Sequence, residues 1–282
     1  MGGLVGYGAY VPYYQLERSR IAGVLGRGAG RGTRSVAGYD EDTTSMAVAA
    51  GRAALAGLTH GGGPGGPPGR GSVRQLFFAT TVPAYADKTN ATAVHAALRL
   101  PADALAVDMA GAVRSGVGAL VTAAQSGVPT MAVLADIRTG LPGGADEQAG
   151  GDGAAAFVFG GADGGLPVLA EIIGQGCATA EFLDRWRAPG TVASRVWEER
   201  FGEQVYGPLA EAAMADALKQ AGLTPGQVDH LIVTGLPARA VNGTIRAAGV
   251  PAEAIADGHA ASMGNAGTAQ PGIMLADVLD RA

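Results

Sequence analysis

The sequence predicts an α/β protein in which layers of helices cover a mostly parallel sheet. Three observations lead to this fold class. The first two are that short β-rich apolar runs alternate with longer helical patterns and that the same rhythm occurs in both halves of the chain. The third is the composition of the 282 residues, of which 48% are hydrophobic and 16% charged. A chain of this length and composition can bury a large core.

Each expected element follows from a local pattern. The first strand ends at Pro12, and Asp42 or Thr43 caps the second helix, whose positive end suits the acidic residues beside it. Gly222 closes the longest helix. The expected strands are Leu4–Val11, Gln75–Thr81, Leu105–Asp108, Thr130–Ala135, Ala154–Phe159, Val168–Gly174 and Val228–Thr234. The expected helices are Gln15–Leu25, Thr44–Leu58, Thr89–Leu98, Val113–Ser126, Val205–Ala221, Val241–Ala248 and Ile273–Leu279. The expected loops are Gly26–Gly32, Gly61–Gly71 and Gly143–Gly153.

The repeated rhythm predicts two halves, residues 1–163 and 164–282, that meet near Gly160–Gly165. A second half comparable to the first would need at least one more strand after Leu279. We therefore expect an incomplete C-terminal half, whose edge is covered either by a continuation of this chain or by another polypeptide.

Composition and charge exclude several classes of function. A net charge of −5 gives no electrostatic footprint for nucleic acid, and the apolar runs are too short to span a membrane. Cys177 is the single cysteine, so we expect no disulfide and no cysteine-based zinc site. Isolated histidines make poor metal sites, so no metal is expected. Since no signal-peptide pattern precedes the first strand, we expect a cytoplasmic protein.

The stretch Ala110–Leu120 has the form of a strand end, a tight turn and a helix start. Gly111 and Ala112 let the backbone turn sharply. Backbone N–H groups and the helix dipole favour an anion at such a turn, and enzymes place a thiolate or an oxyanion there. Here the turn presents Val113, which has no nucleophilic atom.

Five motifs resemble the hydroxymethylglutaryl-CoA synthases of the archaeal and bacterial type, which belong to the thiolase superfamily. They are TyrGlyAlaTyrValPro (Tyr7–Pro12), SerValAlaGlyTyrAspGluAspThr (Ser35–Thr43), ArgSerGlyValGlyAlaLeu (Arg114–Leu120), GlyGlyAspGlyAlaAlaAlaPheValPheGly (Gly150–Gly160) and MetGlyAsnAlaGly (Met263–Gly267). The resemblance covers nearly the whole chain, and the AspGluAspThr block with its helix is its most specific part.

The resemblance implies a thiolase fold: two βαβαβαββ halves stacked in five layers, here with the C-terminal half incomplete. It also implies a coenzyme A thioester as ligand, with no covalently bound cofactor. The expected partners are a second thiolase-like chain, in a homodimer or heterodimer, and a zinc-ribbon/OB-fold protein associated with acyl-CoA.

Family members condense acyl groups with a cysteine, a glutamate, a histidine and an asparagine. The cysteine position is Val113, seven residues before Leu120, and the glutamate position is Thr81, before ValProAlaTyr. The histidine position is Thr234, after an expected strand, and the asparagine is retained as Asn265. A hydroxyl does not titrate near neutral pH, so the resemblance implies that three of the four reactive groups are replaced.

Other residues near the inherited site have both a chemical and a structural interpretation. Asp87 and Lys88, on the loop that also carries Tyr85, can form a new acid–base pair, although a solvated loop pair is the commoner role of such residues. His259 lies six residues before Asn265, on the loop that leads to the same turn. These residues are candidates for proton transfer.

Gly111, Ser115 and Tyr206 are candidates for substrate binding. Ser115 and Tyr206 have packing as the commoner alternative. The remaining candidates favour structural roles: Cys177 is expected to be a buried hydrophobe, His95 to pack in its helix, and His230 and His60 to lie on the surface.

Three functions remain open. The first is a thiolase-like subunit that binds acyl-CoA or partners within an acyl-CoA-processing complex without acylation. The second is a lyase that cleaves a β-hydroxyacyl-CoA by retro-aldol chemistry, with an oxyanion hole from Asn265 and the backbone near Val113. The third, a condensing transferase, lacks the required nucleophile.

Overall fold

The structure is a computed structural model that describes residues 2–26, 31–58, 68–161 and 167–282. The chain divides into two compact units, each described here by itself. Unit 1 comprises residues 1–138, 149–172 and 259–282, and unit 2 comprises residues 139–148 and 173–258. These compact units differ from the predicted halves 1–163 and 164–282, and the repeat of two halves stays a prediction.

Unit 1 is built on a five-stranded sheet. Its strands, in spatial order, are β1 (Gly3–Tyr10), β7 (Gly153–Gly160), β6 (Thr130–Asp136), β4 (Gln75–Thr80) and β5 (Leu105–Ala110). Strand β4 is parallel to β5 and β6, whereas β7 is antiparallel to β6 and β1. The α/β class is confirmed, but the expectation of a mostly parallel sheet is wrong. Strand β7 returns directly from β6 without a crossover helix packed on the sheet, and such a return gives an antiparallel pair.

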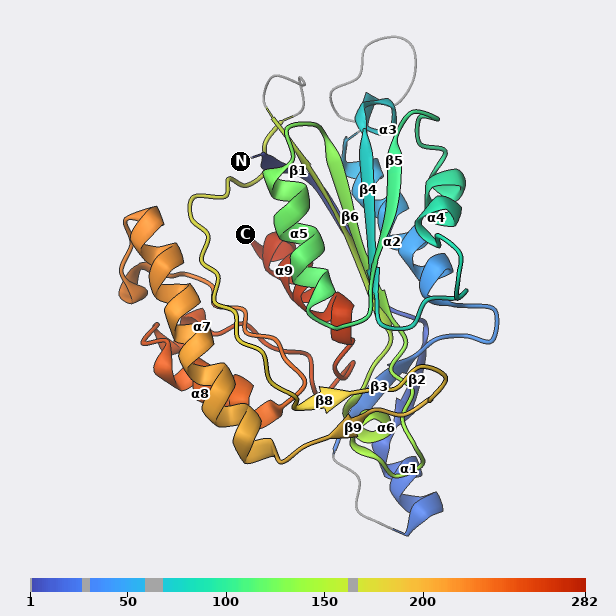
Figure 1. The fold of residues 1–282 in the computed structure, drawn as a ribbon, viewed down its shortest axis with the longest axis vertical. Coiled ribbons are helices and arrows are strands. Elements are labelled where there is room, and N and C mark those ends of the chain that lie inside the picture. The colour runs from blue at the N-terminus through green and yellow to red at the C-terminus, as the bar shows by residue number, and fades with distance from the viewer. Residues whose placement is uncertain (1, 27–30, 59–67, 162–166) are drawn as a thin grey trace. The chain divides into compact units, whose positions relative to one another are not determined.

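Helices cover both faces of this sheet (Figure 1). They are α2 (Thr43–Ala56) and α4 (Ala91–Leu98) on one face, and α5 (Ser115–Gln125) and α9 (Gln270–Arg281) on the other. Strand β6 shows why both faces are needed, because all seven of its residues are buried. Met131 and Val133 pack in the cluster with α2 and α4, and Ala132 and Leu134 pack in the cluster with α5 and α9. Side chains that alternate along a strand thus divide between two cores.

The start of α2 confirms one predicted cap. The Asp42 carboxylate accepts a hydrogen bond from the Ser45 amide at 2.6 Å, and the Ser45 hydroxyl accepts one from the Asp42 amide at 2.8 Å. This capping box satisfies amides that the helix leaves unpaired. It also fixes the loop that enters α2.

Smaller elements differ from the expectation. The predicted helix Gln15–Leu25 divides into β2 (Tyr14–Glu17), which pairs with β3 (Thr33–Val36), and α1 (Arg18–Leu25). The predicted loop Gly143–Gly153 contains α6 (Ala145–Ala149), and the loop Gly61–Gly71 ends in α3 (Pro68–Ser72). The rest of that loop, and residues 27–30 of the loop Gly26–Gly32, lie outside the described residues.

Unit 2 consists of helices joined by extended chain. Its elements are β8 (Arg185–Trp186), β9 (Arg195–Val196), α7 (Glu199–Ala221), the 3-10 turn η3 (Pro225–Gln227), α8 (Ala238–Ala247) and the 3-10 turn η4 (Ala252–Ala254). The expected strand Val228–Thr234 is wrong, because only Leu231 forms a bridge, to Ile255. The expected strand Val168–Gly174, of which residues up to Ile172 lie in unit 1, is reduced in the same way to a bridge between Ala170 and Leu4. A strand requires a neighbour along its length, and the described residues supply one at a single position in each case.

Candidate functional site

The candidate site in unit 1 lies where β4 and β5 end. These strands are parallel and in register, with Thr80 opposite Ala110. The Gly111 amide then donates a hydrogen bond to the Thr80 carbonyl at 3.2 Å. Thr81 and the turn that begins at Gly111 therefore lie side by side at the carboxyl edge of the sheet.

The turn between β5 and α5 has the predicted strand–turn–helix form. Gly111 has a φ of 118°, in the region that favours glycine. The amides of Ser115 and Gly116 donate to the carbonyls of Ala112 and Val113 at 2.9 and 3.2 Å, which closes the turn into the first residues of α5. The Val113 side chain is half-buried beside this helix start.

A second turn packs against α5 and carries Asn265. A Cβ atom on Gly116 would lie 2.4 Å from the Thr268 carbonyl oxygen, so glycine alone permits this approach. The Asn265 backbone bonds to Ala149 and Gly151, and its side-chain oxygen accepts the Gly267 amide at 2.9 Å. Asn265 thereby shapes the turn that leads through η5 (Gly267–Ala269) into α9.

Asp136, the last residue of β6, connects these segments. It is fully buried. Its Oδ1 accepts hydrogen bonds from the Thr81 amide and hydroxyl at 2.7 and 2.8 Å and from the Thr80 hydroxyl at 3.2 Å. Its Oδ2 accepts the amide and hydroxyl of Thr268 at 2.9 and 2.8 Å. One carboxylate thus holds the end of β4 and the Asn265 turn in place.

Arg138 and a second buried carboxylate extend this network. The Arg138 guanidinium lies 3.7 Å from Asp136 and donates to the Thr81 hydroxyl at 3.4 Å. The Arg138 amide donates to Asp152 Oδ1 at 2.8 Å, and Asp152 pairs with Arg34 at 3.5 Å. Because a buried charge is costly unless it is paired, these contacts offset the burial of the charges at this edge of the sheet.

The three proton-transfer candidates lie in different surroundings from this network. Tyr85 and Asp87 are exposed, and Lys88 lies over the Tyr85 ring at 5.5 Å from its centroid. The ring of His259 pairs with Asp277 at 3.1 Å. Asp277 is seven residues into α9, about 10 Å along the helix from its start. His259 lies on the predicted loop, and the bond to Asp277 holds its ring against α9.

Unit 2 contains the family histidine position and one substrate-binding candidate. Thr234 lies in extended chain between η3 and α8. Tyr206 lies within α7, where its hydroxyl donates to Asp184 at 2.8 Å and its ring meets Phe182 edge-to-face. The predicted packing role of Tyr206 is confirmed by these contacts, whereas a role in substrate binding stays a prediction.

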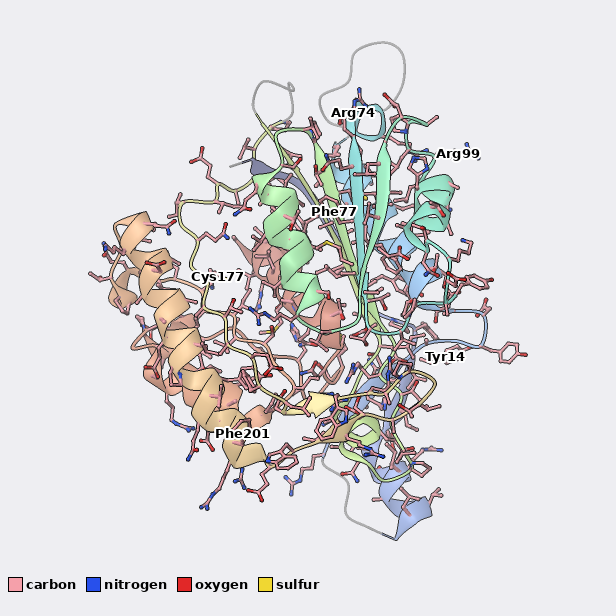
Figure 2. The ribbon with its side chains drawn as sticks, viewed as in Figure 1. Tyr14, Arg74, Phe77, Arg99, Cys177 and Phe201 are labelled. Carbon is pink, nitrogen blue, oxygen red and sulfur yellow. The ribbon has the colours of Figure 1, made fainter. Side chains whose placement is uncertain are left out.

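The remaining candidates have structural surroundings. Cys177 lies on an extended segment whose neighbour Gly176 packs closely against the backbone of α7 at Ala213 (Figure 2). Cys177 is exposed, so its expected burial is wrong: the extended segment contacts α7 through Gly176 and leaves the neighbouring Cys177 side chain at the surface. His230 is exposed, as predicted. His95 bonds to the Pro101 carbonyl at 2.9 Å, and His60 lies outside the described residues.

Sequence reasoning missed the buried polar network, namely Arg34, Asp136, Arg138 and Asp152. One signal was present: Asp136 is the first charged residue after the apolar run that forms β6. Among the described residues, no group of three or more His, Cys, Asp or Glu side chains is placed to hold a metal ion. The described helices include none long and apolar enough to cross a membrane.

The sequence of this chain is similar to those of several curated proteins. It is 31% identical over 241 residues to the hydroxymethylglutaryl-CoA synthase of Aeropyrum pernix and 30% identical over 242 residues to that of Methanopyrus kandleri. The chain is homologous to hydroxymethylglutaryl-CoA synthases. These matches cover 82% of this chain and 64% and 66% of the two synthases, which is just under two thirds of their length. The chain matches no protein-family profile.

Comparisons of structure establish the fold. The 3-oxoacyl-(acyl carrier protein) synthase III of Pseudomonas aeruginosa superposes with a TM-score of 0.80 at 20% identity, over 99% of this chain and 89% of that protein. A single-residue variant of OleA from Xanthomonas campestris superposes with a TM-score of 0.81 at 16% identity, over 99% and 89% of the two chains. This chain therefore has the thiolase fold, as the resemblance implied.

Proposed function

We propose that the chain is a component of an acyl-CoA-processing complex that binds a coenzyme A thioester and has lost the acylating nucleophile. The observation that carries this proposal is the turn into α5, which presents Val113 where the resemblance places a cysteine. An isopropyl group forms no thioester. The backbone around it keeps the strand–turn–helix form, which favours an acyl oxygen or another anion. The homologous synthases are named for a coenzyme A thioester, hydroxymethylglutaryl-CoA.

The other replaced positions support the same proposal. Both the amide and the hydroxyl of Thr81 are bonded to Asp136, so this position supplies structure where the family has a carboxyl group. Thr234 supplies a hydroxyl in place of a base, and hydroxyls do not titrate near neutral pH. A bound acyl-CoA would meet a shaped site without the groups for acyl transfer.

The alternative lyase needs a proton acceptor beside the bound thioester. Tyr85 and Asp87 are exposed, so neither is a desolvated base, whereas the bond to Asp277 orients the His259 ring, as a carboxylate does for a catalytic histidine. The lyase is therefore kept as an outcome of the experiment below.

The experiment measures binding and covalent attachment separately. Titration calorimetry with acetyl-CoA, hydroxymethylglutaryl-CoA and free coenzyme A should show binding of the thioesters. Intact mass spectrometry after the incubation should show an unmodified chain. Release of coenzyme A with an acyl-enzyme adduct would contradict the proposal, and release of an aldehyde or ketone would establish the lyase.

A Val113→Cys variant sharpens the test. A thiol at a helix start has a lowered pKa, so this variant should acquire an acyl group from acetyl-CoA. Ser126→Cys, at the C-terminal cap of α5, and the native Cys177 are the controls and should stay unmodified. Equal labelling of all three thiols would indicate general reactivity and contradict an inherited site at residue 113.

The partner that we propose is a second thiolase-like chain, identical or different. Strand β5 is an edge of the sheet, and its side chains Leu105 and Val107 are 51% and 37% exposed. Unpaired apolar edges are sites of strand pairing. Sedimentation of the unaltered chain should show a dimer, and the Val107→Lys variant should be monomeric. If the unaltered chain is also monomeric, the homodimer is excluded and the heterodimer is tested by mixing the chain with homologous chains. A zinc-ribbon/OB-fold partner stays an expectation from the resemblance.

A further inference from the structure

Three exposed tyrosines gather beside the carboxyl edge of the unit 1 sheet. Tyr13 is 90% exposed, Tyr14 61% and Tyr39 109%. We call these residues, with Asp40 and Glu41, the tyrosine surface. Exposed aromatic clusters are uncommon on a monomer and mark interaction sites, and tyrosine is enriched among the residues that dominate binding energies.

Local contacts join the Tyr13 and Tyr14 rings and place Tyr14 against the loop that carries Tyr39. Strand β2 begins at Tyr14, opposite Val36 of β3, and the chain continues from β3 into the loop at Gly38. The Tyr14 ring lies 3.5 Å from the position that a Cβ on Gly38 would occupy. Tyr13 meets Tyr14 edge-to-face, with ring centroids 5.6 Å apart. Tyr39 follows Gly38 directly, so the rings lie on adjoining segments.

The loop that carries Tyr39 is held in one conformation. Glu41 accepts the Gly38 amide at 2.5 Å and the Tyr10 hydroxyl through its other oxygen. Asp42 is fixed by the capping box of α2. A surface that is ordered before binding loses little conformational entropy when a partner docks. The loop therefore presents Tyr39 as a preorganised contact.

The charge of the surface selects the partner. Asp40 is exposed and makes no hydrogen bond or ion pair with the described part of the chain, and Glu41 lies beside it. These carboxylates repel nucleic acid, anionic lipid and the same surface of a second copy, because like charges facing each other disfavour association. A cationic partner is attracted to them. Lys88 over the Tyr85 ring is an internal example of the pairing that a tyrosine face offers to a cation.

The backbone adds a third element. Strand β2 belongs to a two-stranded sheet with β3, so within the described residues its outer edge has no strand beside it. Edge strands bind extended polypeptides through main-chain hydrogen bonds, and side-chain pockets then give specificity. We propose that the tyrosine surface docks an extended polypeptide segment bearing arginines, which stack on Tyr39 and pair with Asp40. This inference is independent of acyl-CoA binding.

The test uses the full chain and a fluorescent peptide in which arginines alternate with serines. The control peptide has citrulline, which keeps the shape and removes the charge, at every arginine. Fluorescence anisotropy should show saturable binding of the arginine peptide alone. Tyr39→Ser and Asp40→Asn should each weaken it about three- to tenfold, and Tyr39→Phe should retain most of it. Absence of saturable binding would overturn the proposal.

Matched variants separate a specific surface from general attraction to an acidic protein. Asp103 is an exposed carboxylate that precedes β5 at the opposite edge of the sheet, and Trp197 is a 59% exposed aromatic in unit 2. Asp103→Asn and Trp197→Ser should leave the affinity unchanged. If either lowers it as much as Asp40→Asn does, the binding is non-specific and the proposal fails. Circular dichroism of each variant shows whether the fold is retained.

Discussion

The two compact units differ in what their extended segments pair with. In unit 1, β6 lies between two strands, and every one of its residues is buried. In unit 2, the apolar segment Val228–Thr234 forms one bridge, and Ile173 is 59% exposed. Both kinds of segment have strand-like sequences. An apolar run is therefore enough to make a segment extended, but the segment becomes part of a sheet only when a strand lies beside it.

The two units also differ in the size of the apolar side chains that they bury. Unit 1 buries large side chains completely, among them Phe78, Phe157 and Met131. In the described part of unit 2, the buried apolar side chains are the small ones of Ala240, Ala248 and Ala254. Stability from burial scales with apolar area, so we expect unit 1 to carry most of the stability of the chain. Four experiments test the expected difference between the two units.

The largest effect is expected in amide hydrogen exchange. Amides of β6 are bonded to two neighbouring strands and should exchange only through global opening, with protection on the order of ten-thousandfold or more. Amides of residues 171–174 and 176–179 make no hydrogen bond in the described structure and should exchange almost freely. Mass spectrometry of peptic fragments resolves the two segments. Equal protection in both would contradict the proposed contrast.

The next effect concerns aromatic packing. Phe157 of β7 is fully buried among side chains of α5 and α9, so Phe157→Ala should lower the free energy of unfolding by about 3–5 kcal/mol. Phe201 of α7 is 37% exposed and meets Phe182 edge-to-face, so Phe201→Ala should cost about 1 kcal/mol. Urea unfolding followed by circular dichroism measures both. A larger loss for Phe201→Ala would place the main core in unit 2.

A smaller loss is expected when one buried carboxylate is neutralised. Asp136→Asn removes the charge that pairs with Arg138 and puts amide hydrogens against donors, which should cost about 2–3 kcal/mol. The matched variant Asp184→Asn in unit 2 keeps an acceptor for the Tyr206 hydroxyl and should cost less than about 1 kcal/mol. Denaturant midpoints compare the two. Similar small losses would show that the Asp136 network is dispensable.

The smallest effect is a shifted titration at the rim of unit 1. The hydrogen bond to Glu41, with burial, raises the pKa of Tyr10 from 10.0 to about 12. Stability from this bond is present below pH 10 and is lost as the pH rises through 12. Glu41→Gln should bring the pKa of Tyr10 down toward 10, as followed by phenolate absorbance, with Tyr10→Phe to assign the signal. An unchanged titration would mean that the bond is absent in solution.

Local patterns were sufficient to predict most of the fold of unit 1. The expected helix Val113–Ser126 and the observed α5 (Ser115–Gln125) differ by a few residues, because an apolar period and a turn are properties of neighbouring residues. Pairing between distant segments was not predictable in this way. Residues 15–17 fit a helical pattern, but they pair with β3 some way along the chain. The strand expected at Val228–Thr234 failed for the converse reason, since in the described structure its pairing is limited to the bridge between Leu231 and Ile255.

In the candidate site too, features set by neighbouring residues were predictable and contacts between distant residues were not. The turn at Gly111 was predictable, because strand, glycine and helix follow one another. The role of Asp136 was not, because its partners Thr81 and Thr268 are 55 and 132 residues away. His259 was correctly placed on the loop before Asn265, but its bond to Asp277 depends on how α9 packs. Sequence therefore predicted the turn at Gly111 and missed the buried residues that hold the neighbouring segments together.

The position of α9 has a consequence for how the chain is made. The five strands of the sheet are all synthesised by Gly160, whereas α9, whose Ile273 and Ala276 cover one sheet face, begins about 110 residues later. At usual rates of translation the part of that face beside α5 that α9 covers stays exposed on the ribosome for roughly 5 to 20 seconds. During this interval the nascent chain exposes apolar surface, and we expect chaperones that shield such surfaces to bind it.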